Sequence, residues 1–354
     1  MATNEAVPTL RPGPRATVSA GLIAAARHAF SLGSVAAVLD LGGTYSLNLR
    51  LRTDRETVVL RIYRPWVTPA RLASVQAVRA GLHVGGLPVL PARLTRDGSG
   101  AITVDQRLVE AEPWRPDDGG AATPARNLAA AHLLAGLHTA LRRIGRSVPV
   151  VPAPVSNTLP TADFDDWLRR TVAAVGQRPA SAETRLALAA CRTVAVIAED
   201  ARRTPQAHPP LPCQLTHGDF GHENVRFTGD TPSLIVDFDF LGVRPRVADL
   251  ADLAFGPHWM VSFGQTERPP ADRDWDAVAG LIRSYDAAAG QSLVAAEIAA
   301  LPLAMAMLPL TWVAASWLHD DAVAALNLVA PELPTAAWLV HHHQDLARRW
   351  NDSR

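Results

Sequence analysis

A short segment, LTHGDFGHENVRFTGDTPSLIVDFDF, concentrates side chains that could carry out chemistry: histidines, aspartates, a glutamate and an asparagine lie between apolar runs. Its apolar parts NVRF and SLIVDF are separated by the turn-forming sequence TGDTP, which predicts a β-hairpin. If the pairing is symmetric about the turn, the opposed residues are Phe227 and Leu234, Val225 and Val236, and Asn224 and Asp237. The hairpin would then bring an amide and a carboxylate to one place.

Directly opposed residues of an antiparallel pair have side-chain roots about 5 Å apart, so a hard cation could be held between Asn224 and Asp237. Asp219 precedes Asn224 in a loop, which would carry a second carboxylate close to that cation without requiring it to bind. Phosphoryl transfer uses such an arrangement, in which the free carboxylate accepts or orients the proton of an attacking hydroxyl. An ordinary acidic loop beside a hairpin is the alternative.

The spacing agrees with the protein-kinase pattern HRDxxxxN followed by DFG, because this chain reads HGDFGHEN and then VDFDF. With the continuation LGVRPRVADLADLAF, the segment resembles the aminoglycoside phosphotransferase and choline kinase-like family, whose fold is that of the protein kinases. The resemblance covers most of the chain in order and is specific across residues 215–255. It implies that Asp219 is the catalytic base. It also implies that Asn224 and Asp237 bind magnesium and that His217 braces the loop.

Asp249 matches a family aspartate at the start of the next helix, where helix capping alone would also account for it. Kinases also pair a cationic strand residue with a glutamate on the following helix, yet no glutamate occurs between Glu56 and Glu110. Gln76, on the predicted helix, is the nearest substitute. We expect Gln76 to accept a hydrogen bond from Arg61, although an amide cannot neutralise the guanidinium.

The sequence VVLR corresponds to the kinase VAIK, in which the lysine binds phosphates. Val59 and Arg61 would point to one face of a strand, so we expect Val59 to touch adenine and Arg61 to bind the phosphates. Arginine suits phosphate because it is always charged and can bind bidentately. A solvent-facing arginine on an edge strand is the alternative.

Two further segments could contact a nucleotide. LGGTYS lies where the nucleotide-covering loop belongs, which makes Gly42, Gly43 and Ser46 candidates, although a plain turn fits equally well because the full glycine spacing is missing. RLVEAEPWRP resembles the strand and hinge between the lobes, with backbone groups near Glu112 and Trp114 expected to bind the adenine edge. A domain linker with a core tryptophan is the alternative.

Hydrophobic periodicity predicts the elements that position these residues. Helices are expected over residues 17–30 and 69–82, two strands with a turn at 54 over 36–65, and further strands around a turn at 97–100. Leucine stripes after residue 113 predict a mostly helical remainder. The expected fold is therefore α+β, bilobal and protein-kinase-like. A small antiparallel β-sheet lobe with one principal helix would occupy residues 1–112, and a larger helical lobe residues 113–354.

Composition narrows the class of protein. Hydrophobic residues make up 48% and charged residues 19% of the 354 residues, which is typical of a globular protein. The 34 basic residues, all arginine, balance 34 acidic ones, so charge favours neither nucleic acid nor a membrane surface as a partner. The apolar run 298–318 contains Pro302 and Pro309 and is expected to form a buried helical pair, not a membrane segment.

The two cysteines match no metal or redox spacing, and the N-terminus does not resemble a secretory signal, so a cytoplasmic location is expected. The predicted function is ATP- or GTP-dependent, Mg²⁺-dependent phosphorylation of a hydroxyl group on a small molecule, such as an antibiotic or another natural product. A homoserine- or choline-type kinase is the alternative. The protein would be a monomer or homodimer.

Two other classes stay open. His217, Asp219 and His222 form HxDxxH, which could belong to a zinc or two-metal hydrolase, and a non-catalytic nucleotide-binding relative is the third class. Carboxylates that could line a cleft for a polycationic acceptor are Asp163, Asp165, Asp166, Asp272, Asp274 and Asp276, with ordinary helix starts as the alternative. Trp167, Trp259 and Trp275 would equally suit a less charged, partly apolar acceptor, with core positions as the alternative. His222, Glu223 and Asp239 receive no role.

Overall fold

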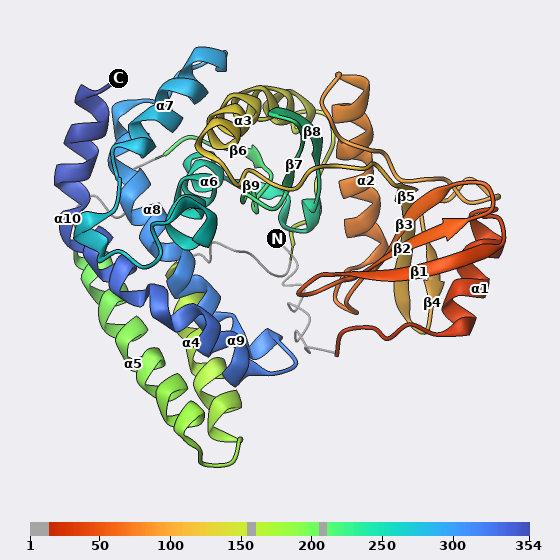
Figure 1. Cartoon of the computed structure of the whole chain (residues 1–354), viewed down its shortest axis with the longest axis horizontal. Helices are drawn as coiled ribbons and strands as arrows, with labels where there is room; N and C mark the ends of the chain where they lie inside the picture. The colour runs from red at the N-terminus through yellow and green to blue at the C-terminus, as the bar shows by residue number, and fades with distance from the viewer. Residues whose placement is uncertain (1–13, 154–160, 205–210) are drawn as a thin grey trace, which may run out of the picture. The chain divides into compact units, whose positions relative to one another are not determined.

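The structure is a computed structural model that describes residues 14–153, 161–204 and 211–354 (Figure 1). The chain divides into two compact units, which we describe separately. The described residues of Met1–Leu72, together with Arg93–Trp114 and Leu318–Asp320, form the smaller unit. The described residues of Ala73–Ala92, Arg115–Trp317 and Asp321–Arg354 form the larger unit.

The smaller unit is built on an antiparallel sheet with the strand order β1-β2-β3-β5-β4. Its strands are β1 (Val35–Gly42), β2 (Leu47–Thr53), β3 (Thr57–Ile62), β4 (Ile102–Val104) and β5 (Arg107–Pro113). Helix α1 (Ala20–Ala29), capped by Ser19, supplies Leu22 and Ala26 to a core that it shares with alternate residues of β2, β3 and β5. Alternation in β3 buries Val58, Leu60 and Ile62.

Two predictions about this sheet were wrong. Residues 36–65 form three strands instead of two, because Gly42 and Gly43, with φ of 88° and 117°, begin a turn that separates β1 from β2. The turn near residue 97 exists, but no strand precedes it. Strands β4 and β5 are instead joined across Asp105 and Gln106, both with positive φ.

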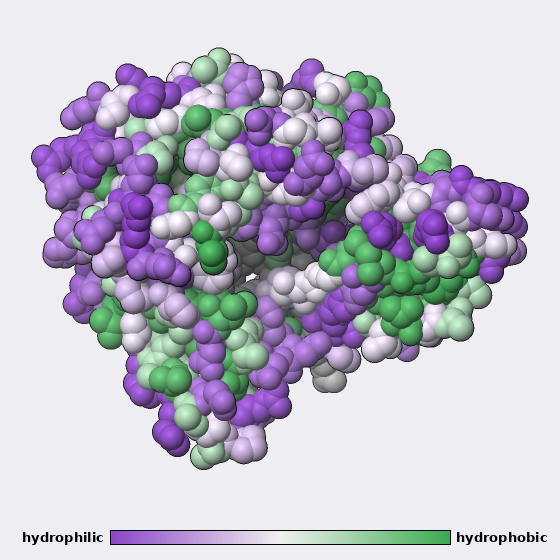
Figure 2. Space-filling model, viewed as in Figure 1, coloured by the Kyte–Doolittle hydropathy of each residue, from purple (hydrophilic) through white to green (hydrophobic). Residues whose placement is uncertain are grey.

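Exposed apolar side chains gather on the smaller unit over β1 (Figure 2). Val38, Leu39 and Leu41 of β1 are exposed there.

Helix α2 (Pro69–Val84) begins after Thr68, whose hydroxyl accepts a hydrogen bond from the backbone N–H of Arg71 at 3.1 Å. The prediction of this helix is thereby confirmed, and the helix ends slightly later than expected.

The larger unit is mostly helical, with two short two-stranded sheets, β6–β9 and β7–β8. Its helices are α3 (Pro124–Ile144), α4 (Thr161–Gly176), α5 (Ala182–Arg203), α6 (Val247–Trp259), α7 (Ala277–Ala288), α8 (Ala295–Ala314), α9 (Ala322–Val329) and α10 (Leu333–Asp352). Its strands are β6 (Cys213–Thr216), β7 (Val225–Thr228), β8 (Thr231–Ile235) and β9 (Gly242–Pro245).

Helix α8 corrects the prediction of a helical pair. One helix continues through Pro302 and Pro309, both buried, because packing against α6 and α10 outweighs the backbone hydrogen bonds that proline removes. By length and composition α8 and the stretch 322–352 could each span a membrane, but most of the apolar window of α8, 72%, is buried inside the protein. A helix buried in a protein core can have the same length and apolar composition as a membrane-spanning helix.

Candidate active site

The loop of residues 217–224 connects β6 to β7 and contains most of the predicted chemistry. It opens with a turn at Gly218, where φ is 85° and a Cβ atom would lie 2.3 Å from the carbonyl oxygen of Phe240. Only glycine fits this position. The carboxylate of Asp249 accepts hydrogen bonds from the backbone N–H groups of His217 at 2.8 Å and Gly218 at 2.7 Å. The start of the loop is therefore held by a residue of the following helix.

The imidazole of His217 is buried inside the loop that it was predicted to brace. Its Nδ1 accepts a hydrogen bond from the backbone N–H of Asp219 at 3.3 Å, so Nε2 carries the proton that it donates to the carbonyl of Val236 at 3.0 Å. Burial lowers the pKa of His217 and favours the neutral ring. Both ring nitrogens are thus engaged, which leaves neither available to a metal.

Asp219 and Asn224 are joined by direct hydrogen bonds. The amide Nδ2 of Asn224 donates to the backbone carbonyl of Asp219 at 2.8 Å and to its carboxylate Oδ2 at 3.0 Å. This geometry turns the amide oxygen of Asn224 away from Asp219. Burial raises the pKa of Asp219 well above its ordinary range, and the negative charges of Asp252 and Asp237 raise it further.

The hairpin after the loop has a different register from the predicted one. Val225 pairs with Ile235 and Arg226 with Leu234, because the turn contains only Gly229 and Asp230. The expected pairs Phe227 with Leu234, Val225 with Val236 and Asn224 with Asp237 were wrong; the ladder is irregular after Arg226, and Phe227 pairs with Pro232. The backbone of Asn224 instead accepts a hydrogen bond from Val236 at 2.9 Å.

Asp237 lies two residues after the end of β8, in a left-handed conformation with φ 64° and ψ 65°. A short 3-10 helix, Phe238–Phe240, begins directly after it. The charge of Asp237 acts on Asp219, so the structure gathers both carboxylates and the Asn224 amide around one loop. The donor set, carboxylate and amide oxygens, fits magnesium. Within the described part of the chain no cluster of three His, Cys, Asp or Glu side chains forms a metal site.

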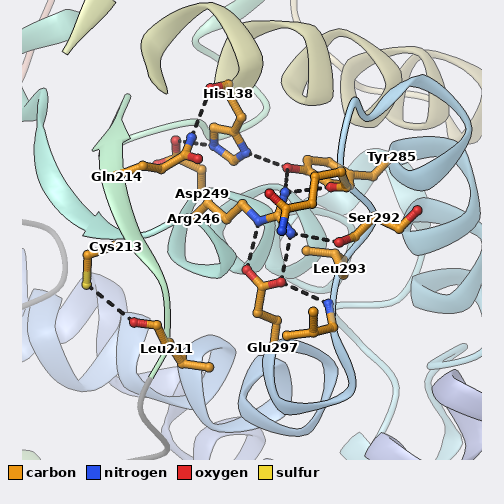
Figure 3. A network of polar contacts seen from close by, with 12 residues as sticks. His138, Leu211, Cys213, Gln214, Arg246, Asp249, Tyr285, Ser292, Leu293 and Glu297 are labelled. Carbon is orange, nitrogen blue, oxygen red and sulfur yellow. Dashed lines mark hydrogen bonds and ion pairs between the residues drawn. The ribbon is translucent and has the colours of Figure 1, made fainter. Parts of the chain in front are cut away.

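Asp249 belongs to a buried polar network behind the loop (Figure 3). Its Oδ2 lies 3.0 Å from Nε2 of His138, and Nδ1 of that ring lies 2.8 Å from the hydroxyl of Tyr285. The alternative role, capping of its own helix, does not apply, because no side-chain hydrogen bond caps α6. Burial opposes ionisation, but the hydrogen bond from His138, the charges of the two histidines and the hydrogen bond from Gly218 lower the pKa of Asp249 overall.

Arg246 extends this network (Figure 3). Its Nε and Nη2 donate to the two carboxylate oxygens of Glu297 at 2.7 and 2.8 Å, and its Nη1 and Nη2 also donate to the backbone carbonyls of Gln291 and Ser292. Both partners are almost completely buried. The network therefore ties α6, which carries Asp249, to the start of α8.

In the smaller unit, β3 places Val59 and Arg61 on the face opposite the core, as its alternation predicted. Val59 pairs with Glu112 on β5, and Arg61 pairs with Glu110. The guanidinium of Arg61 lies 5.5 Å from the ring centre of Tyr63. Gln76 lies on α2 within the larger unit, so its contact with Arg61 stays a prediction.

The remaining residues predicted to contact a nucleotide lie after two strands of the same sheet, at the end of β1 and at the end of β5. Gly42 ends β1, and a Cβ atom on Gly43 would lie 2.4 Å from the carbonyl of Ser46, so the turn is closed by its own backbone. Ser46 is buried. Trp114 follows β5 and donates its backbone N–H to Thr57 at 3.0 Å.

Most acidic side chains suggested for an acceptor cleft have local partners. Asp165 pairs with Arg202, Asp166 with Arg169 and Arg170, Asp276 with Arg349, and Asp274 accepts a hydrogen bond from the backbone of Ala277. Trp167 and Trp275 are buried core residues, whereas Trp259 is half-buried. Asp252, His138 and Arg244 also act on this site, and sequence patterns did not predict them. The repeat of DLA in VADLADLAF was the one signal that could have pointed to Asp252.

Comparisons with known proteins identify the family and the fold. Residues 38–290 match the phosphotransferase enzyme family. An amicoumacin kinase in complex with AMP-PNP, Ca²⁺ and its ligand is similar in structure, with a TM-score of 0.61, 12% identity and coverage of 90% of this chain and 93% of that one. A spectinomycin phosphotransferase in complex with ADP and spectinomycin gives a TM-score of 0.63 and 10% identity, covering 93% and 99%.

A microcompartment-associated aminopropanol kinase gives a TM-score of 0.62 and 17% identity, covering 92% of this chain and 98% of that one. No curated protein matches the chain. The chain belongs to the phosphotransferase enzyme family and has the predicted protein-kinase-like fold. It is a small-molecule kinase, an enzyme that transfers a phosphoryl group to an alcohol group.

Proposed function

We propose that this kinase transfers the γ-phosphate of ATP or GTP to a hydroxyl group of a small molecule, with Mg²⁺ as cofactor and residues 217–224 as its catalytic loop. The observation that carries the proposal is the 3.0 Å hydrogen bond between the Asn224 amide and the Asp219 carboxylate. It ties a candidate base to a candidate metal ligand, which is the pairing that phosphoryl transfer uses.

Asp219 is the proposed catalytic base. Its environment raises its pKa, which makes the ionised carboxylate a better proton acceptor for the attacking hydroxyl. His217 and Asp249 are the proposed structural supports, because one fixes the backbone of Asp219 and the other fixes the backbone at the start of the loop.

Asn224 and Asp237 are the proposed magnesium ligands. Bound there, magnesium would neutralise charge on the transferred phosphoryl group. The donor set supports this role, and so does the mutual repulsion of carboxylates around Asp219, which a cation would relieve.

The proposed nucleotide-binding lobe is residues 1–112, with residues 113–354 as the catalytic and acceptor-binding lobe. Val59 would contact adenine and Arg61 the phosphates, since both lie on the face of β3 that the core does not use. The turn containing Gly42, Gly43 and Ser46 would cover the nucleotide. Backbone groups near Glu112 and Trp114 would bind the adenine edge, and Gln76 would support Arg61.

The proposed acceptor is a hydroxylated small molecule of the natural-product or antibiotic type. Structural neighbours named for amicoumacin and spectinomycin support this choice. The aminopropanol kinase among the neighbours favours the second candidate, a kinase for a small metabolic alcohol. A cytoplasmic location, a monomeric or homodimeric state and the absence of nucleic-acid or membrane partners stay predictions.

The test is Mg²⁺-dependent release of ADP or GDP in the presence of a panel of alcohols, compared between the wild type and Asp219→Ala. We expect phosphorylated product from at least one alcohol and a loss of about 10²- to 10⁴-fold in kcat in the variant. Nucleotide affinity, measured by calorimetry, should persist. Nucleotide binding without turnover would identify a non-catalytic relative, and nucleotide-independent hydrolysis would identify a hydrolase.

A further inference from the structure

A cavity of about 440 Å³ lies in the larger unit, between the segment that follows α2 and the second half of α3. Gly85 and Leu87 form the first wall, and residues 136–146 form the second. None of the residues that line the cavity belongs to the catalytic loop or to the proposed nucleotide site. Pockets of a few hundred Å³ hold small organic ligands. The size of the cavity therefore suits such a molecule.

Three arginines, Arg142, Arg143 and Arg146, give the cavity its charge. Arg142 donates from Nη1 to the amide oxygen of Gln291 at 2.7 Å, which is a neutral partner. In the described parts of the chain no acidic side chain lines the cavity, and the guanidinium groups of Arg143 and Arg146 have no hydrogen-bond or ion-pair partner. Like charges at the i+3 and i+4 spacings repel each other. The cavity thus has excess positive charge that an anion would neutralise.

The wall after α2 is fixed by hydrogen bonds of the chain itself. The backbone N–H of Leu87 donates to the carbonyl of Leu82 at 3.1 Å, and that of Gly86 donates to the carbonyl of His83 at 3.0 Å. Gly86 has a φ of 81°, so these two bonds end α2 in a Schellman motif. Nδ1 of His83 lies 2.8 Å from the carbonyl of Val89, which ties the helix end to the next segment. The cavity is therefore formed before any ligand binds.

The α3 wall brings a guanidinium group close to the end of α2. A Cβ atom on Gly85 would lie 3.5 Å from Nη2 of Arg143. Thr139, one turn before Arg143, also lines the cavity. The preceding residue, His138, lies 3.0 Å from Asp249 in the buried network (Figure 3). A ligand in the cavity would therefore contact the helix that supports the proposed catalytic loop.

The lining favours a phosphate group over a carboxylate. Guanidinium groups bind both anions bidentately. A phosphate monoester has about −1.5 to −2 charges at pH 7 and three terminal oxygens, so it can engage three arginines, whereas a carboxylate has one charge and two oxygens. Leu87 and Ala140 also line the cavity and offer apolar contact to a carbon chain. An organic phosphate matches both parts of the lining.

We propose that this cavity is a binding site for a small organic phosphate monoester. Arg142, Arg143 and Arg146 bind its phosphate group, and Leu87 and Ala140 contact its carbon part. The phosphate supplies the negative charge that the described residues around the cavity lack. The site shares no residue with the proposed nucleotide, metal or acceptor positions, so the inference does not depend on the proposed function.

Isothermal titration calorimetry with propyl phosphate at low ionic strength tests the site. Propyl phosphate has no hydroxyl group, so it cannot be a phosphoryl acceptor. Arg143→Ala and Arg146→Ala should each raise its Kd about tenfold, and the double variant about 30-fold or more, through loss of charge-assisted hydrogen bonds. Arg143→Lys should keep part of the affinity, because it retains the charge.

Two further ligands test the chemical class. Inorganic phosphate should bind more weakly than propyl phosphate because it lacks the carbon chain. Butyrate, the carboxylate of similar size, should bind at least about tenfold more weakly because it has one charge. Arg185→Ala, at an exposed arginine of α5 outside the cavity, is the matched control and should leave the Kd of propyl phosphate at the wild-type value.

Four results would overturn the inference. They are equal affinity of the wild type and the double variant, no binding of propyl phosphate up to about 10 mM, butyrate binding as tightly as propyl phosphate, and displacement of propyl phosphate by AMP-PNP with Mg²⁺. The last result would place the ligand in the proposed active site. Circular dichroism checks the fold of each variant, and the single variants give the same comparison if the double variant does not fold.

Discussion

Asp249 holds His217 from the far side of the catalytic loop: its carboxylate accepts the backbone N–H of His217 at 2.8 Å, while His138 lies 3.0 Å from the same oxygen. This contact makes the position of the loop depend on helices α3 and α6. The geometry of the proposed catalytic loop therefore depends on packing within the larger unit.

The magnesium ligands can be tested by metal titration. Asp237→Asn should raise the Mg²⁺ concentration for half-maximal activity at least roughly tenfold, because one anionic ligand becomes neutral. Asn224→Ala should also lower kcat, since the same amide holds Asp219. Asp230→Asn, in the exposed turn of the same hairpin, is the control. An unchanged metal requirement in both site variants would remove the assignment.

Arg61 should act on the nucleotide. Arg61→Ala should raise the KM for nucleotide about tenfold or more through loss of a charge-assisted contact with phosphate, and Arg61→Lys should restore part of it. Arg55→Ala, in the exposed turn between β2 and β3, should have no effect on that KM. Steady-state kinetics with nucleotide varied gives the comparison, and equal KM values for all these variants would contradict the role.

Two glycines of the catalytic loop should respond oppositely to alanine. Gly218→Ala should destabilise the protein by about 1–3 kcal/mol and abolish most activity, because φ is positive and the carbonyl of Phe240 blocks the new methyl group. Gly221→Ala should fold normally, since the nearest atom lies 3.6 Å from its Cβ. Thermal unfolding and activity assays distinguish the two. If Gly221→Ala lost as much stability and activity as Gly218→Ala, the positive φ and the Phe240 carbonyl would not explain the loss in Gly218→Ala.

Neutralising one partner of the buried ion pair between Arg246 and Glu297 should lower the free energy of unfolding. Glu297→Gln should cost about 3–5 kcal/mol of unfolding free energy by leaving Arg246 without its counter-charge, whereas the double variant Arg246→Met with Glu297→Leu should cost less. Asp345→Asn, from an exposed pair, should cost about 1 kcal/mol or less. Urea titrations give the values. A double variant less stable than Glu297→Gln would refute the electrostatic account.

Asp252 should make stability depend on pH. Burial and the charge of Asp249 raise its pKa to about 7 from an ordinary 3.8, despite the opposing charge of Arg244. Between these pH values the unfolded chain releases a proton that the folded protein keeps, so the free energy of unfolding falls as pH rises. Without metal, Asp252→Asn should therefore exceed the wild type in stability at pH 8 by about a few kcal/mol.

The extra stability of Asp252→Asn over the wild type should shrink towards pH 4, where Asp252 in the folded wild type is protonated and therefore neutral, as asparagine is. Urea unfolding across pH 4–8, with chelator present, measures the difference. Asp219 is coupled to the same charge, so Asp219→Asn serves as the companion variant. A stability difference that stays constant with pH would mean that Asp252 ionises normally.

Local sequence patterns identified many of the elements correctly. The alternation VVLRI placed Val59 and Arg61 on one face of β3, and Thr68 with Pro69 marked the start of α2. The spacing of Asp219, Asn224 and Asp237 also identified the loop that gathers them. These features depend on residues close in sequence, where backbone preference and side-chain periodicity act directly.

Such patterns did not predict the register of the β7–β8 hairpin or the continuity of α8 through its two prolines. Register depends on how many residues the turn uses, and the choice of Gly229 and Asp230 shifted every predicted pair. Pro302 and Pro309 predicted a break, but the surrounding helices keep α8 continuous. In both cases contacts outside the local segment decided the outcome.

The reaction proposed for the loop follows from local sequence, because the residues proposed for phosphoryl transfer lie within a short stretch joined by a turn and a hairpin. The surroundings of these residues depend instead on the packing of distant segments. Asp249 meets His138 across 111 positions of sequence, and Asp252 became a buried carboxylate without a partner because α6 packs behind the loop. Burial and long-range contact set the charge of a site, and neither can be read from spacing along the chain.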